Sequence, residues 1–131
     1  MQPAGHIGRT LAALAFSAAT LAACAPMVES TPATLATATA PRDIEIRGNT
    51  TIALSTGYSR RLEAGGRWRE MGRLPEGAVF RPLDSVFSIE GRQAHEAWLV
   101  IDGTRLVGFY LPGEHRYSTL DPAIQLNLGG L

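Results

Sequence analysis

The sequence has no lysine, a single cysteine and no excess of charge of either sign. All twelve basic side chains are arginine, and twelve acidic side chains bring the formal net charge to zero. Without lysine, a Schiff-base or general-base lysine is excluded. One cysteine cannot form an internal disulfide or a zinc site built on paired cysteines. The neutral balance argues against nucleic acid as the main partner, because nucleic-acid binders favour a basic surface.

The apolar run near the N-terminus is short. Thr10–Ala23 carries no charge, but its 14 residues fall below the roughly 20 that a transmembrane helix needs. A short start containing Arg9 precedes it, and small residues follow. This arrangement is typical of a secretory signal peptide, which we expect to comprise residues 1–23.

The motif "LAAC" at Leu21–Cys24 resembles the lipobox of bacterial lipoproteins. The resemblance implies cleavage before Cys24, a diacylglycerol on its thiol and an acyl chain on the new N-terminus. In Gram-negative lipoproteins a residue other than aspartate after the cysteine implies export to the outer membrane, so Ala25 is the expected sorting residue. The alternatives are an inert buried cysteine and a catalytic thiol, but neither a histidine nor an acid lies beside Cys24 to lower its pKa.

Residues 24–41 form the next segment, rich in alanine, threonine and proline. They contain one charge, Glu29, and no aromatic residue, so they cannot bury enough surface to offset the entropy of ordering. We therefore predict a disordered, lipid-anchored tether that typically spans roughly 20–25 Å. A short helix over "ATLATATA" is the alternative, although threonine is a poor helix former.

Residues 42–131 have the pattern of a small β-domain. Apolar residues alternate at Ile44, Ile46, Ile52 and Leu54, as expected for half-buried strands. Gly65-Gly66 indicates a hairpin between two short runs. We predict an all-β fold, a small barrel or sandwich of about six to eight short antiparallel strands.

The clearest element is "HEAWLVIDGTRLVGFYLP", residues 95–112, because Asp102-Gly103 lies between two apolar runs. A two-residue turn there would pair residue 101 with 104 and residue 98 with 107. In this register Phe109 shares a face with Glu96 and Trp98. Both faces are largely apolar, so we expect the hairpin to lie at the centre of the domain.

The segment Leu74–Leu111 weakly resembles bacterial SH3-like domains. "LPEGAVF" followed by "AWLVIDGTRLVGFYL" would match their successive core strands, which implies a small barrel. The chain lacks the tandem tryptophans and groove aromatics that would imply peptidoglycan binding.

An arginine-rich stretch, residues 60–73, holds five arginines and two glutamates around a tryptophan. Arginine pairs well with phosphates and carboxylates, and tryptophan anchors interfaces. One interpretation is a surface for an anionic envelope partner; the other is a solvated hairpin whose arginines and glutamates pair across strands. The candidate binding residues are Arg60, Arg61, Arg67, Trp68, Arg69 and Arg73.

A second candidate polar site comprises His95, Glu96 and His115, which flank the central hairpin. They could ligate a metal or serve as solvated caps at strand ends. No catalytic signature is visible, and we expect no metal and no cofactor other than the covalent lipid on Cys24.

These patterns together predict a lipid-anchored, non-enzymatic envelope protein at the outer membrane, facing the periplasm. It would bind the membrane through its lipid and an envelope protein or polymer through its β-domain, without nucleic acid. One alternative is an inhibitor or accessory subunit of an envelope enzyme or secretion machine. Another is a small hydrolase or metal-binding enzyme that uses the histidine site.

Overall fold

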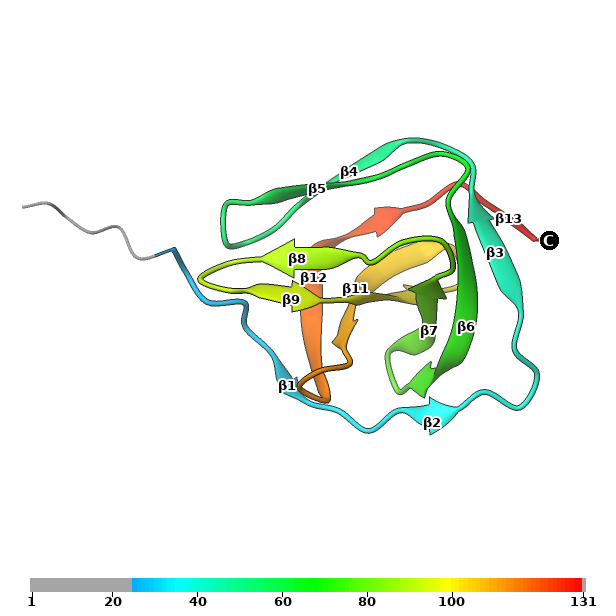
Figure 1. Ribbon diagram of the computed structural model, residues 1–131, viewed down its shortest axis with the longest axis horizontal. Helices are drawn as coiled ribbons and strands as arrows, with labels where there is room; N and C mark the ends of the chain where they lie inside the picture. The colour runs from blue at the N-terminus through cyan, green and yellow to red at the C-terminus, as the bar shows by residue number, and fades with distance from the viewer. Residues whose placement is uncertain (1–24, 131) are drawn as a thin grey trace, which may run out of the picture.

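The computed structural model describes residues 25–130, so the predicted signal peptide and Cys24 lie outside the described residues. Within them the chain forms strands and no helix (Figure 1). The strands are β1 (Thr31–Pro32), β2 (Ala36–Thr37), β3 (Asp43–Ile46), β4 (Thr50–Ala53), β5 (Ser59–Leu62), β6 (Arg67–Leu74), β7 (Gly77–Pro82), β8 (Ser88–Glu90), β9 (Ala94–Glu96), β10 (Trp98–Asp102), β11 (Arg105–Leu111), β12 (Arg116–Gln125) and β13 (Leu128–Gly130).

Nine strands form one antiparallel sheet in the order β1-β12-β11-β10-β7-β6-β3-β13, with β2 paired to β6. Hairpins β4–β5 and β8–β9 form two separate two-stranded sheets. The predicted all-β class is confirmed, and within residues 25–130 the large sheet does not close into a barrel. The architecture is that of a small sandwich, in which the two hairpins pack against one face of the large sheet (Figure 1).

The main core lies between the sheet and the two hairpins. Ile44 and Ile46 of β3 are buried, as their alternation predicted, and Ile52 and Leu62 of the β4–β5 hairpin close over them. Phe87 connects the layers: its ring centroid lies 5.5 Å from Trp68 and 6.2 Å from Phe109. Burial of these large side chains is the main favourable term for a domain of this size.

The central hairpin lies where the sequence indicated, with β10 between β7 and β11, but the predicted register is wrong. Asp102 pairs with Arg105, so the loop is Gly103-Thr104, and Gly103 has a positive φ of 65°. The predicted turn, Asp102-Gly103, therefore lies one residue too early in the chain. A register irregularity then places Leu99 opposite Phe109, and Phe109 enters the main core instead of sharing a face with Trp98.

The pair Gly65-Gly66 does not connect two paired strands, as the sequence suggested. β5 pairs with β4, whereas β6 pairs with β3 and β7. The glycines therefore carry the chain from one sheet to the other, and the hairpin prediction there is wrong. Pro75-Glu76 instead forms a two-residue turn, since Leu74 and Gly77 face each other as the last pair of β6 and β7.

The outer face of the sheet carries a smaller apolar cluster. Its buried members are Leu74, Val79, Val100, Tyr110 and Tyr117. They alternate along the strands with main-core residues, as the two-residue period of a strand requires. Two residues from before the domain, Ala33 and Leu35, pack onto this cluster.

Residues 25–41, which we call the N-terminal strap, differ from the disordered tether that their composition predicted. The strap follows the lower edge of the domain in Figure 1, first as β1 and then as β2. β1 pairs with the start of β12, and β2 pairs with Gly72 and Arg73 of β6. The strap is ordered because its backbone adds to existing strands, which satisfies its polar groups without large apolar side chains.

Candidate functional site

Three arginines of the arginine-rich stretch form ion pairs with nearby carboxylates. Its partners are carboxylates of the same surface: Arg61 Nε lies 3.3 Å from Glu63 Oε1, Arg67 Nη2 lies 3.6 Å from Asp84 Oδ2, and Arg69 Nε lies 2.9 Å from Asp43 Oδ1. Apart from Asp43, which is partly buried, these side chains are exposed, and such pairs contribute little to stability. This is the arrangement expected of a solvated face whose charges are compensated locally.

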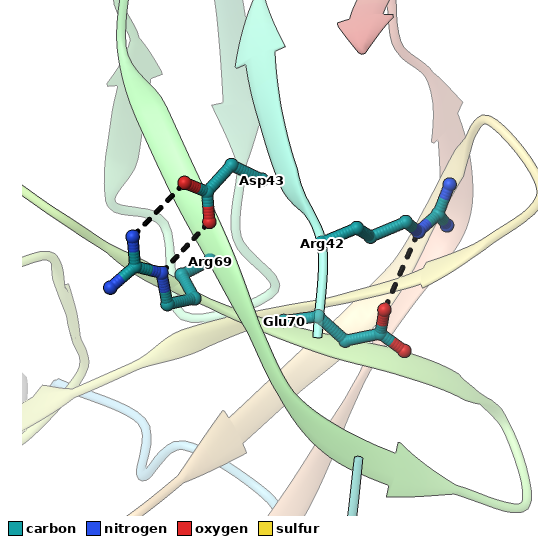
Figure 2. A network of polar contacts seen from close by, with 4 residues as sticks. All are labelled: Arg42, Asp43, Arg69 and Glu70. Carbon is teal, nitrogen blue, oxygen red and sulfur yellow. Dashed lines mark hydrogen bonds and ion pairs between the residues drawn. The ribbon is translucent and has the colours of Figure 1, made fainter. Parts of the chain in front are cut away.

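Figure 2 shows the most regular of these contacts, where β3 lies beside β6. Arg69 donates two hydrogen bonds to Asp43, of 2.9 and 3.1 Å, and the two residues are direct register partners. The hydrogen bond from Arg69 holds the pKa of the Asp43 carboxyl below its ordinary value. Next to it, Arg42 Nε lies 3.4 Å from Glu70 Oε2. These two pairs join the start of β3 and the residue before it to β6.

The tryptophan of the stretch is a core residue. Trp68 is 5% exposed and packs edge-to-face on Phe87, so it is not an exposed interface anchor. Arg60 covers the other side of the same cluster, with its guanidinium 4.9 Å from the Phe87 ring centroid. Arg73 is exposed on β6 beside β2.

The second predicted site does not converge. His95 Nδ1 lies 2.8 Å from Glu114 Oε1, whereas Glu96 Oε1 accepts a hydrogen bond of 3.4 Å from Trp98 Nε1. His115 has a positive φ of 54° and lies 3.2 Å from the Tyr110 hydroxyl, a member of the outer-face cluster. Among residues 25–130 no three His, Cys, Asp or Glu side chains are placed to hold one metal ion.

A groove of about 1140 Å³ lies between the strap, the β8–β9 hairpin and the start of β12. A smaller cavity of about 360 Å³ adjoins it and shares the lining residues Val28, Glu29, Ser55, Ser118 and Thr119. The groove is lined by Pro26, Met27, Val28, Glu29, Ser30, Thr31, Ser55, Arg92, Gln93, His95, Leu111, Glu114, Arg116, Tyr117, Ser118 and Thr119. Of the predicted site residues, His95 alone lines it.

Four polar side chains of the groove are engaged with one another, as the pairs Arg116–Ser30 and His95–Glu114. Arg116 donates hydrogen bonds to Ser30, from Nε to Oγ at 2.7 Å and from Nη2 to the carbonyl oxygen at 2.6 Å. Burial raises the pKa of the Tyr117 phenol, and its hydroxyl donates to the Val107 carbonyl at 3.0 Å. The lining therefore combines apolar side chains with fixed hydrogen-bonding groups, which suits binding of a ligand.

Sequence reasoning missed this groove because the strap forms one wall. The residues that could have indicated it are two glycines, Gly72 and Gly91, against which the strap packs. At Gly91 an added Cβ would lie 2.6 Å from the Pro26 carbonyl oxygen and 3.0 Å from Val28 N. At Gly72 it would collide with the Ala36 carbonyl oxygen and Leu35. Both glycines leave room for the strap to cross closely.

No known family model, curated protein or solved structure matches this chain. The resemblances to lipoproteins and to SH3-like domains therefore stay predictions. Within residues 25–130 the structure contains no helix that could cross a membrane.

Proposed function

We propose that the chain is a lipid-anchored, non-enzymatic binding module of the bacterial envelope, held at the outer membrane and facing the periplasm. The observation that supports this best is the continuity between the lipobox and the folded domain. Ala25 follows Cys24 directly, and the Pro26 carbonyl already accepts a hydrogen bond of 3.0 Å from Arg92 N. A lipid on Cys24 would hold a rigid β-domain close to the membrane.

The groove beside the strap is the place where we propose that an envelope partner binds. It offers apolar lining from Val28 and Leu111 together with the fixed polar groups of Ser30 and Arg116. The arginine-rich stretch is the weaker candidate, because three of its five arginines are in local ion pairs and its tryptophan is buried. A partner protein fits this groove through an extended segment that contacts strap and β12 together.

Lipidation is tested by metabolic labelling of the full chain with an alkyne fatty acid. The wild type should incorporate label, and Cys24→Ala should accumulate as an unlabelled precursor. Ala25→Asp is the matched control for sorting: it should be labelled normally but remain in the inner membrane. Normal labelling of Cys24→Ala would refute the lipid anchor.

Partner binding is tested with a photo-crosslinking amino acid at Thr119 in the groove and, as control, at Arg81, which is exposed on β7. Crosslinking in native membranes should yield one defined adduct from position 119 and none from position 81. Recovery of lipid alone from both positions contradicts the proposed protein partner.

A further inference from the structure

One end of the domain gathers the start of the strap and two hairpin turns. In Figure 1 the strap begins at the left, beside the β8–β9 tip and the β4–β5 turn, while β13 and the C-terminus lie at the right. Pro26 is held over Gly91 by the hydrogen bond from Arg92 N. The Thr56 hydroxyl donates to the Glu90 carbonyl at 2.6 Å. These contacts join the three segments into one rigid surface, which we call the anchor pole.

The anchor pole exposes apolar side chains. Three large hydrophobic residues are notably exposed within residues 25–130: Met27 at 61%, Tyr58 at 42% and Val86 at 71%. Met27 follows Pro26 directly, and Tyr58 belongs to the β4–β5 turn, where its carbonyl accepts a hydrogen bond of 2.8 Å from Leu54 N. Tyrosine is a side chain favoured at membrane interfaces because it presents an apolar ring and a polar tip.

We propose that the anchor pole is the membrane-facing surface of the domain, with Met27, Tyr58 and Arg92 against the headgroups of phospholipids. This rests on the proposed lipid on Cys24. From the Cα of Cys24 to that of Pro26 the chain spans at most about 8 Å. A domain of this size is roughly 30 Å across. The short connection therefore cannot let the opposite end of the domain turn toward the bilayer.

The charges of the anchor pole add to this orientation only weakly. Arg92 is exposed and can pair with a lipid phosphate, but Glu29 and Glu90 are exposed nearby. His95 and Glu114 form their own contact farther along the groove. With one arginine against two glutamates, the pole gains no net attraction to an anionic bilayer, so the covalent lipid and the strap set the orientation. We therefore expect it to depend little on ionic strength.

The test measures the depth of two labels in the full lipidated protein, reconstituted into phosphatidylethanolamine–phosphatidylglycerol vesicles. Gln93→Cys places a fluorophore at the anchor pole, and Asn127→Cys places one in the exposed residue before β13. Cys24 is the only native cysteine and carries the lipid, so each label has one position. Lipids with a nitroxide on the headgroup should quench the label at 93 at least three-fold more than the label at 127.

A flexible linker provides the decisive variant. Eight Gly-Ser residues inserted between Ala25 and Pro26 leave the lipobox, the sorting residue and the strap contacts intact. The difference in quenching between the two labels should fall to less than half of its original value. Equal quenching without the linker, or a difference that the linker leaves unchanged, overturns the membrane-facing pole while the lipid anchor stands. A protein that fails to float with vesicles overturns the lipid anchor and the membrane-facing pole together.

The contact of Tyr58 is tested by Tyr58→Asp, with Val86→Asp as the matched control at an exposed apolar residue outside the pole. We expect Tyr58→Asp to reduce quenching at position 93 and Val86→Asp to leave it unchanged. The same result for both variants contradicts headgroup contact by Tyr58.

Discussion

The strap and the arginine-rich stretch 60–73 both differ from what their compositions suggest: a disordered tether for the strap, and a binding surface for the stretch. The strap has few apolar side chains and one charge, yet it pairs with both β12 and β6 and forms a wall of the groove. The arginine-rich stretch has the composition of a binding surface, yet three of its five arginines are in local ion pairs and its tryptophan is buried. The strap shows that a segment with few apolar side chains can be ordered by pairing with strands elsewhere in the chain. The arginine-rich stretch shows that ion pairs with neighbouring carboxylates can occupy charges that would otherwise be open to a partner.

The largest expected effect separates Trp68 from the arginines around it. Trp68→Ala removes a buried ring that packs on Phe87, and we expect a loss of about 3–5 kcal/mol in the free energy of unfolding. Arg67→Ala removes an exposed ion pair and should cost less than about 1 kcal/mol. Urea denaturation followed by circular dichroism measures both. Equal losses would mean that the arginines, and not the core, stabilise this stretch.

The next effect concerns the fit between the strap and β6. Gly72→Ala should displace residues 35–37, because the new methyl group collides with Leu35 and the Ala36 carbonyl, at a cost of about 1–3 kcal/mol. Limited proteolysis should then cut the strap much faster than in the wild type. Gly113→Ala is the control, since nothing lies within 4 Å of the added atom. A strap that stays resistant in Gly72→Ala contradicts the close crossing.

A smaller effect is expected at the contact between the strap and β12, where Arg116 binds Ser30. Arg116→Ala removes two hydrogen bonds to Ser30, and we expect a loss of about 1–2 kcal/mol. Amide hydrogen exchange should accelerate at Thr31 and Ala33, which flank a proline without an amide hydrogen, and remain unchanged in β6. Faster exchange throughout the sheet would show that Arg116 stabilises the whole domain and not the strap alone.

The smallest effect tests the paired charges of Figure 2. The pKa of Asp43 is lowered in the folded state, so its contribution to stability is present above the unfolded value of 3.8 and is lost as the pH falls through the folded value. Asp43→Asn should therefore flatten the dependence of the urea midpoint on pH below about 4, and leave the midpoint at pH 7 slightly lower. An unchanged acid dependence would rule out this pair as a contributor.

Much of the fold could be predicted from the sequence. The alternation at Ile44 and Ile46 and the apolar runs around Gly103 indicate strands, and the apolar side chains of these strands are buried in the core. The register of the hairpin at Gly103 could not be predicted, since a bulge changes which face Phe109 occupies without altering the pattern of residue types. The groove could not be predicted either. It depends on the position of the strap, and the features that accept the strap are glycines far away in the sequence.

The contact between Ser30 and Arg116 joins residues 86 positions apart. In a chain made from its N-terminus, Gly72, Gly91 and Arg116 are all synthesised after the strap that they receive. Until β12 exists, β1 has no edge to pair with, although β2 can already pair with β6. The order of synthesis thus leaves the start of the strap, next to the proposed processing site at Cys24, among the last parts of the chain to be fixed in the sheet.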